Sequence, residues 1–263
     1  FDLSELKKEF SHCSCGMKHE LNIKEVAIGS GIVSEAGKIL KKNGFGKRLL
    51  LVADENTIAA AEGILPALKD FSLTTKIYKN LREATVKETQ VIKELLKETD
   101  GVISVGTGSL NDICRKAAAE SDKKLCLFAT AASMDGFASY GAPLTDGNFK
   151  ATYPAKSPEV IIADTKILAA APATLKGAGF GDMVGKYVGL IDWQVSHLMT
   201  GEYYCEKVAA LTRKATDRIM ALADRITAED EASAEAVFEA LLLTGIGMSF
   251  TKTSRPASGT EHI

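Results

Sequence analysis

Residues 101–120 read GVISVGTGSLNDICRKAAAE, and this stretch decides the fold. An apolar run is followed by a turn with glycines at 106 and 108, and then by residues with helical spacing. A strand, a glycine turn and a helix N-terminus together place backbone N–H groups and the positive end of the helix dipole where a pyrophosphate can bind. Asn111 stands where the usual dinucleotide fingerprint has its third glycine, so the match is partial, and a plain strand-to-helix turn is the alternative.

Other short apolar runs surround this stretch, each bounded by Gly, Asp or Asn. They occupy residues 21–29, 47–54, 74–80, 124–130 and 159–164. Between most of them the apolar residues recur at helical intervals, as in 32–44 and 86–98. Strands that are apolar throughout and alternate with helices indicate a parallel sheet with helices on both faces. The fold class predicted for this part of the chain is therefore α/β.

The regular alternation of strands and helices stops after residue 142. Residues 143–158 contain Asp146-Gly147, a turn signal that favours a β-hairpin. From residue 165 onward the pattern is helical, so we expect a domain boundary near residue 164. The prediction is a nucleotide-binding α/β domain over residues 1–164, followed by an all-α domain over residues 165–263.

Three breaks are expected in the helical part, at Pro172, Gly201 and near Thr227. Thr227 to Asp230 resembles a capping box with Asp in place of the usual Glu, and it predicts the start of a helix rich in Ala, Glu and Leu.

The composition is that of an ordinary folded protein, with 263 residues of which 46% are hydrophobic and 25% are charged. These values disfavour disordered, collagen-like and disulfide-scaffold classes. The 32 basic and 34 acidic residues give a formal net charge of −2 and are interspersed along the chain. A protein that binds along nucleic acid or an anionic membrane usually has an excess or a cluster of basic residues, and this sequence has neither. We therefore expect a small-molecule substrate as the partner, and no nucleic acid.

Three further features predict a cytoplasmic protein. The uncharged stretch 240–251 is shorter than the roughly 18–20 apolar residues that a membrane span requires, so no membrane span is expected. The first ten residues have no apolar core preceded by basic residues, as a secretory signal would. The cysteine count is odd, and Cys114, Cys126 and Cys205 are scattered in apolar or helical surroundings, which suits reduced thiols.

Two more segments could contact a nucleotide. Asp54 ends an apolar run, where dinucleotide folds place an acid on a ribose, although an Asp there could equally cap the next helix. Residues 130–139 follow another strand and are small and polar. Hydroxyls at Thr130, Ser133 and Ser139 and the carboxylate of Asp135 could bind a ligand, and an ordinary loop is the alternative.

Glycines and an acid occur together in residues 177–186. Glycines destabilise a helix, so three of them before Asp182 suggest close approach by a metal or a substrate. The alternative is a surface ion pair between Asp182 and Lys186, which are four residues apart. His262 follows a break rich in Pro and Gly, and a lone His is more often a surface or core residue than a ligand.

The N-terminal segment carries Cys13, Cys15 and His19, which are ligand types that zinc favours. Its C-x-C spacing is not that of a standard zinc knuckle, and no second cluster follows in the sequence. A short loop with two reduced thiols is the plainer interpretation.

Together, these segments resemble the iron-containing or polyol dehydrogenase superfamily, and most closely its glycerol-1-phosphate dehydrogenases of the bacterial type. The resemblance is carried by CSCGMKHELNIKEVAIGSG, VADENT, VGTGSLND, TAASMDGFAS, KGAGFGDMVGK and SRPASGTEH. The last four of these segments occur in the same order as in the family, and the numbers of residues between them are compatible with the family's spacing. The resemblance implies a nucleotide-binding α/β domain followed by an all-α domain, the two-domain plan of dehydroquinate synthase, with the active site in the cleft between them.

The resemblance also implies roles for individual residues. NAD or NADP would contact Asp54, Gly106, Gly108, Ser109, Leu110, Asn111, Asp112, Thr130, Ala131, Ala132, Ser133 and Ser139. Asp135 and Asp182 would contact the substrate. Asp182 and His262 would be catalytic, as two of three protein ligands to one divalent metal, zinc or nickel. A homo-oligomer is common in this superfamily.

The family pattern continues past Glu261-His262 with two further histidines, so a chain that stops at Ile263 is expected to lack one metal ligand. For the full-length protein, the resemblance implies reduction of dihydroxyacetone phosphate to sn-glycerol 1-phosphate by metal-assisted hydride transfer from NAD(P)H. Lys186 and Arg255 are candidates for binding the phosphate. The alternatives are a glycerol dehydrogenase, an enzyme like dehydroquinate synthase, or a non-catalytic nucleotide-binding module with an incomplete metal site.

Overall fold

The computed structural model describes residues 2–226 and 228–262 of the chain. Internal contacts divide the chain into two compact units. The first, which we call the α/β unit, comprises Asn22–Ala131 and Tyr140–Ala171. The second, the helical unit, comprises Phe1–Leu21, Ala132–Ser139 and Pro172–Ile263. The boundary near residue 164 stays a prediction, because contacts within the folded chain do not show which part folds independently.

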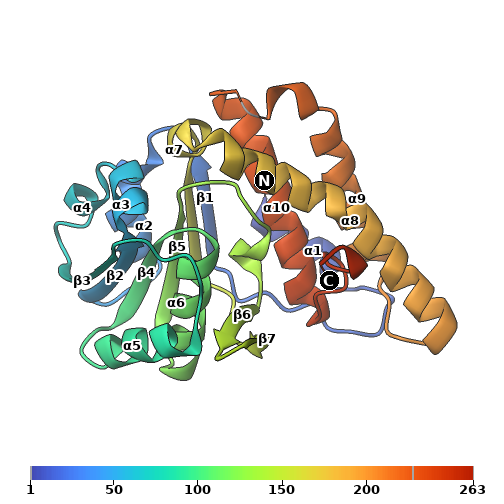
Figure 1. Ribbon diagram of the computed structural model, residues 1–263, viewed down its shortest axis with the longest axis horizontal. Coiled ribbons are helices and arrows are strands. Elements are labelled where there is room, and N and C mark those ends of the chain that lie inside the picture. The colour runs from blue at the N-terminus through green and yellow to red at the C-terminus, as the bar shows by residue number, and fades with distance from the viewer. Residues whose placement is uncertain (1, 227, 263) are drawn as a thin grey trace. The chain divides into compact units, whose positions relative to one another are not determined.

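The α/β unit contains a six-stranded parallel sheet in the order β1-β8-β5-β4-β2-β3 (Figure 1). Its strands are β1 (Glu25–Gly29), β2 (Arg48–Asp54), β3 (Ser72–Tyr78), β4 (Gly101–Gly106), β5 (Lys124–Ala129) and β8 (Val160–Asp164). Each strand falls within or overlaps one of the apolar runs of the sequence, and every pairing is parallel, so the predicted sheet is confirmed. Strands β4 and β8 are buried along their whole length, whereas the edge strand β3 is mostly exposed.

Helices cover both faces of this sheet. They are η1 (Ile32–Glu35), α2 (Ala36–Lys42), α3 (Glu55–Ala60), α4 (Ile64–Ala67), α5 (Val86–Leu96), α6 (Gly108–Glu120) and α7 (Thr165–Ala170). On one face, Leu49, Leu51 and Ile103 pack into a hydrophobic core with residues of α2 and α4. Alternate strand residues such as Leu50 and Val102 point to the other face, where α6 contacts β4 and β5, and they are fully buried.

The predicted hairpin is confirmed as β6 (Gly141–Asp146) and β7 (Phe149–Pro154), which pair antiparallel. Asp146 lies opposite Phe149, so the connection is a tight two-residue loop. Gly147 in that loop has a φ of +60°, which glycine adopts more readily than other residues.

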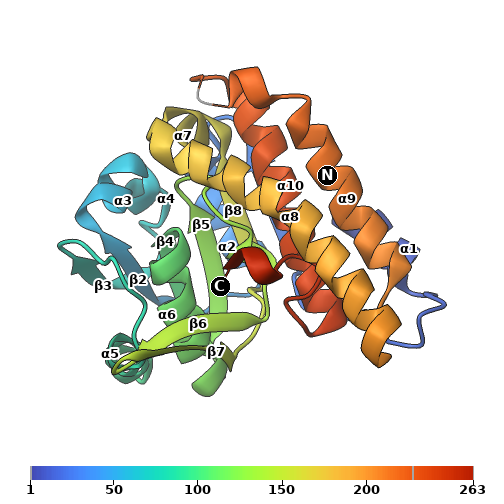
Figure 2. The same cartoon turned by 45° about the vertical axis from the view of Figure 1, so that its right-hand side comes forward.

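The helical unit contains α1 (Leu3–Phe10), η2 (Gly136–Ala138), α8 (Ala173–Thr200), α9 (Glu206–Met220), η3 (Ala223–Arg225), α10 (Glu231–Thr251) and η4 (Thr260–His262). Helices α8, α9 and α10 lie side by side (Figure 2). Two of the predicted breaks are confirmed, because Pro172 precedes α8 and Gly201, with a φ of +74°, ends it. The helical character expected after residue 164 is also confirmed.

The last long helix begins later than the predicted capping box would place it. Thr227 lies outside the described residues, and α10 starts at Glu231 with Asp230 as its N-cap. Asp230 Oδ1 accepts the Ala232 N–H at 3.2 Å, so this carboxylate caps the helix itself instead of serving as the last residue of a box.

Helix α10 is long and apolar enough to meet a length-and-composition test for a membrane span. However, 89% of the tested window is buried inside the protein. Burial of this kind is typical of a core helix in a folded domain.

Candidate active site

Two of the predicted nucleotide-binding motifs lie at the carboxyl ends of neighbouring strands. Asp54 ends β2 and Gly106 ends β4, and these strands pair directly, with Val52 opposite Ser104. From β2 the chain moves to β3 on one side, whereas from β4 it moves to β5 and then β8 on the other. Open α/β sheets bind ligands at such a topological switch point, outside the carboxyl ends of the strands.

The first turn of α6 is open to an approaching group. Thr107 precedes the helix as its N-cap and makes no side-chain capping hydrogen bond. A Cβ on Gly108 would meet nothing within 4 Å. Because the first N–H groups of a helix have no partner within the helix, this turn can bind an anion. Gly106 has a packing role instead, since a Cβ there would lie 2.4 Å from the Leu110 side chain.

Asn111 ties α6 to β4. Its side chain is fully buried, and Oδ1 accepts the Ser104 hydroxyl at 2.8 Å. This hydrogen bond holds the helix close to the strand, the function that the third glycine serves in the usual fingerprint. Neighbouring polar groups are also engaged, because Ser109 Oγ donates to the Arg82 carbonyl and Asp112 accepts from Arg115.

Asp54 caps the helix that follows it. Its Oδ1 accepts the Thr57 N–H at 2.8 Å, and Thr57 Oγ1 accepts the Asp54 N–H at 2.9 Å, which completes a capping box at the start of α3. Of the two roles left open by the sequence, the capping role is therefore observed. Contact with a ribose stays a prediction.

The residues after β5 are divided between the units. Thr130 and Ala131 belong to the α/β unit, whereas Ala132, Ser133 and Ser139 belong to the helical unit. All are buried except Ser133, which is partly exposed. Their contacts with a cofactor stay predictions.

Two helical glycines make room for the segment that carries Asp135. A Cβ on Gly179 in α8 would lie 2.0 Å from the carbonyl oxygen of Ala132, and a Cβ on Gly245 in α10 would lie 2.3 Å from that of Asp135. The sequence suggested that glycines before Asp182 admit a metal or a substrate. At Gly179 that interpretation is wrong, because the group that approaches is the protein's own backbone.

Asp135, Asp182 and Lys186 form one buried cluster. Lys186 Nζ lies 2.8 Å from Asp135 Oδ2 and 2.5 Å from Asp182 Oδ1. The Lys186 side chain is 1% exposed, and those of Asp135 and Asp182 are 16% and 13% exposed. Asp182 Oδ2 also accepts the Asp135 backbone N–H at 2.8 Å. The pair Asp182–Lys186 therefore forms as its spacing allows, but it is buried and shared with a third group.

Lys186 is held in its charged form. Burial alone would lower the pKa of this ammonium, but the negative charges of Asp135 and Asp182 outweigh burial and raise the pKa. The cluster is thus a place in the helical unit where two carboxylates surround a positive charge.

This cluster opens to a cavity of about 600 Å³ in the helical unit. The lining residues are Met134, Asp135, Gly181, Asp182, Val184, Gly185 and Glu261. Glu261, which the sequence did not single out, reaches the cavity because η4 is anchored to α8. Thr260 N and Oγ1 both donate to Asp192 Oδ2, at 2.7 and 2.8 Å. His262 belongs to η4, but its side chain lies outside what the structure describes, so its role as a metal ligand stays a prediction.

Both residues suggested for binding a phosphate are already paired with carboxylates. Lys186 lies between Asp135 and Asp182, and Arg255 Nε donates to Glu202 Oε1 at 2.9 Å. Neither offers an uncompensated charge to a phosphate, so the structure argues against these two residues in that role.

The N-terminal thiols are not in an isolated loop. Cys205, which immediately precedes α9, lies beside Cys13, Cys15 and His19. The ligand atoms of all four residues lie within 4.8 Å of one another. The sequence pattern missed Cys205 because nothing in its local surroundings distinguishes it from a buried core thiol.

A family model for iron-containing alcohol dehydrogenases matches residues 27–172 of this chain. Among curated relatives, the glycerol-1-phosphate dehydrogenase (NAD(P)+) of Halalkalibacterium halodurans is 34% identical over 269 residues, which cover 99% of this chain and 67% of that protein. The enzyme of the same name from Thermococcus sibiricus is 32% identical over 243 residues, or 91% of this chain and 69% of that protein. The chain thus spans about two thirds of the length of these relatives.

Solved structures show the same fold. An iron-containing alcohol dehydrogenase from Thermotoga maritima superposes with a TM-score of 0.72 at 16% identity, covering 90% of this chain and 70% of that one. A probable glycerol dehydrogenase from Sinorhizobium meliloti superposes with a TM-score of 0.71 at 20% identity, covering 87% of this chain and 66% of that one. With its parallel sheet, its helical unit and these relatives, the chain belongs to the iron-containing alcohol dehydrogenase family, whose members are NAD(P)-dependent, metal-containing dehydrogenases.

Proposed function

We propose that this chain belongs to an enzyme that reduces dihydroxyacetone phosphate to sn-glycerol 1-phosphate with NADH or NADPH. The relatives reported above support the reaction, because both are named for this activity. Their alignments cover 99% and 91% of this chain. The observation that carries the proposal is the cluster of Asp135, Asp182 and Lys186 beside a cavity large enough for a small phosphorylated substrate.

The dinucleotide would bind to the α/β unit at the first turn of α6. The open backbone at Gly108 supports this, because the phosphates of a dinucleotide must approach such a turn closely. The switch point between β2 and β4 also supports it. A carboxylate at Asp54 would repel the 2′-phosphate of NADP, so we favour NAD.

A divalent metal would be held by Asp182 and His262, and zinc and nickel both suit carboxylate and imidazole ligands. The residues fit a cation, because the two carboxylates of Asp135 and Asp182 outnumber the single ammonium of Lys186, and both carboxylates line the cavity. When bound, the metal supplies a Lewis acid for the carbonyl oxygen of the substrate.

The chain's own residues would position the reactants. The carboxylate of Asp135 lines the cavity and would accept a hydrogen bond from a substrate hydroxyl. Lys186 holds Asp135 and Asp182 in place, since its ammonium contacts both carboxylates. The nicotinamide supplies the hydride, so the protein contributes binding and orientation.

The reaction is tested by following NADH and NADPH oxidation by a protein that contains this chain together with any segment that follows it in its gene. Turnover is expected with dihydroxyacetone phosphate and not with dihydroxyacetone. An Asp182→Asn variant should lose turnover and the metal that Asp182 would hold, while keeping its fold by circular dichroism. Turnover confined to dihydroxyacetone or glycerol would replace the proposal with a glycerol dehydrogenase, and an Asp182→Asn variant with full turnover would refute the role of Asp182.

We also propose a cytoplasmic location and a homo-oligomeric state. The five free cysteines support a reducing compartment. Labelling of thiols in intact cells and sedimentation of the purified protein test these two proposals.

A further inference from the structure

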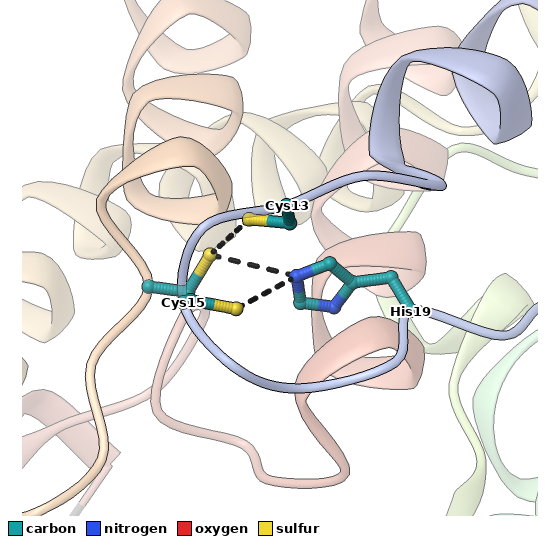
Figure 3. Close-up of side chains that lie close together, drawn as sticks. Cys13, Cys15 and His19 are labelled. Atoms are coloured by element: carbon teal, nitrogen blue, oxygen red, sulfur yellow. Dashed lines mark hydrogen bonds between the residues drawn. The ribbon is translucent and has the colours of Figure 1, made fainter.

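Four potential metal ligands in the helical unit converge on one point. Cys13, Cys15 and His19 come from the N-terminal segment and point toward one another (Figure 3). Cys205 comes from the start of α9, far along the chain. His19 and Cys205 are buried, and Cys13 and Cys15 are half-buried. Three thiols and one imidazole are a common ligand set of structural zinc sites.

Three of the six distances between ligand atoms are close to those of a tetrahedral zinc site, and all six are within 4.8 Å. With Zn–S bonds of about 2.3 Å and a Zn–N bond of about 2.0 Å, ligand atoms at tetrahedral angles lie about 3.8 Å apart for two sulfurs and about 3.5 Å apart for sulfur and nitrogen. Here Cys13 Sγ and Cys205 Sγ are 3.6 Å apart. His19 Nε2 lies 3.2 Å from Cys15 Sγ and 3.6 Å from Cys205 Sγ. A disulfide would bring two sulfurs to about 2.05 Å, and all of these cysteines are free.

The surroundings orient the ligands as they do in known metal sites. His19 Nδ1 lies 3.1 Å from the carbonyl oxygen of Phe250, so the ring directs Nε2 toward the sulfurs. A ligating His usually donates its second ring N–H in this way, which sets its tautomer and orientation. The ring of Phe10 stands edge-on to His19 and stacks on Phe250, which shields the imidazole from water. Tyr203 OH lies 3.2 Å from Cys15 Sγ.

The chain makes a sharp turn to present these ligands. Gly16, between Cys15 and His19, has a φ of +83°, a conformation that a side chain would strain. The turn brings Cys15 and His19 to the same side, where Cys205 completes the set. A metal here would cross-link the N-terminal segment to the start of α9 within the helical unit.

We propose that Cys13, Cys15, His19 and Cys205 bind one Zn²⁺ as a structural site of the helical unit. All four zinc positions are filled by protein ligands, so the site has no open position for a substrate or water. It is separate from the cluster around Asp182 and uses none of its residues.

The site is tested by metal analysis of the protein with Asp182→Asn as the background, so that a metal held by Asp182 does not contribute. About one zinc per chain is expected in this background. Cys13→Ser or Cys205→Ser should reduce it to a small fraction of that value. Cys114→Ala removes a buried thiol of the α/β unit and is the matched control, which should keep its zinc.

A second measurement does not depend on whether the cysteine variants fold. Co²⁺ is exchanged into the Asp182→Asn protein, and its absorption spectrum is recorded. The proposal requires a thiolate-to-cobalt charge-transfer band together with intense visible bands typical of tetrahedral geometry. Absence of these bands, zinc content that survives Cys205→Ser, or a Cys13–Cys205 disulfide in freshly prepared protein would each overturn the proposal.

Discussion

Lys186 is the residue on which the acidic cluster depends. Its ammonium contacts Asp135 and Asp182 and is almost completely excluded from solvent. Removing one partner of a buried ion pair leaves the other charge uncompensated, and such changes typically cost about 3–5 kcal/mol. Here two carboxylates would lose their shared cation.

We therefore expect Lys186→Met to lower the free energy of unfolding of metal-free protein by about 3 kcal/mol. Lys97→Met is the matched control, because Lys97 pairs with Glu94 on the surface, where both side chains are 66% exposed. The control should change stability by no more than about 0.5 kcal/mol. Urea unfolding of both variants measures the difference, and similar values for the two would show that the buried pair adds little.

The second prediction at this scale concerns Gly108. A Cβ there meets nothing within 4 Å, so Gly108→Ala should leave the stability of the protein nearly unchanged. It should weaken binding of NADH about tenfold, or about 1.4 kcal/mol, because the methyl group fills the space through which a pyrophosphate approaches the helix. Fluorescence titration with NADH measures the affinity, with urea unfolding as the control. Unchanged affinity would place the dinucleotide elsewhere.

At the scale of elements, α8 and α10 hold the segment 132–139 through their glycines. Gly179 and Gly245 allow two helices to approach backbone carbonyls of this segment more closely than any side chain would permit. Asp135 lies in this segment, so its position depends on the packing of both helices. Ser249 in α10 adds a hydrogen bond of 2.6 Å to the Ala138 carbonyl.

Two alanine substitutions in the same helix should therefore have opposite effects. Gly179→Ala places a Cβ 2.0 Å from the Ala132 carbonyl oxygen, and we expect a loss of about 2–3 kcal/mol because the backbone must move. Gly177→Ala meets nothing within 4 Å, and alanine favours a helix over glycine, so a gain of up to about 1 kcal/mol is expected. Thermal unfolding of the two variants measures both. A loss at Gly177 as large as that at Gly179 would show that helix flexibility, and not close approach, explains these glycines.

Helix N-caps and the hairpin turn show how well local sequence predicts where a helix or a turn begins. Asp54 and Asp230 both cap helices, and each has a hydroxyl residue three positions later. Thr57 Oγ1 accepts the Asp54 N–H and completes a capping box, whereas Ser233 Oγ donates to the Asp230 carboxylate. At the start of α10, Thr227 and Asp230 both suit an N-cap by residue type, so the sequence alone did not separate them. The hairpin was easier to predict, because Asp-Gly suits the tight turn at Gly147.

At the scale of the whole molecule, the parallel sheet was predictable because buried strands are apolar on both faces and therefore appear as continuous runs, as β4 and β8 do. Contacts between distant residues were not predictable in the same way. Lys186 could be paired with Asp182 from its spacing, but not with Asp135. Cys205 lies 186 positions after His19, and only the fold brings the two together.

The zinc proposal predicts where stability changes when the metal is removed. A ligand that binds the folded state stabilises it by mass action, and a metal that joins two segments should stabilise those segments most. Chelation should therefore speed amide hydrogen exchange about tenfold or more around Cys13, His19 and the first turn of α9, where the ligands lie. Strand β4 in the α/β unit should keep its protection.

The control is Cys13→Ser, in which exchange around Cys13, His19 and the first turn of α9 should already be fast, and chelation should not increase it further. Equal acceleration throughout both units, or none near Cys13, would contradict a local structural metal, because the four ligands all belong to the helical unit and none contributes to the sheet.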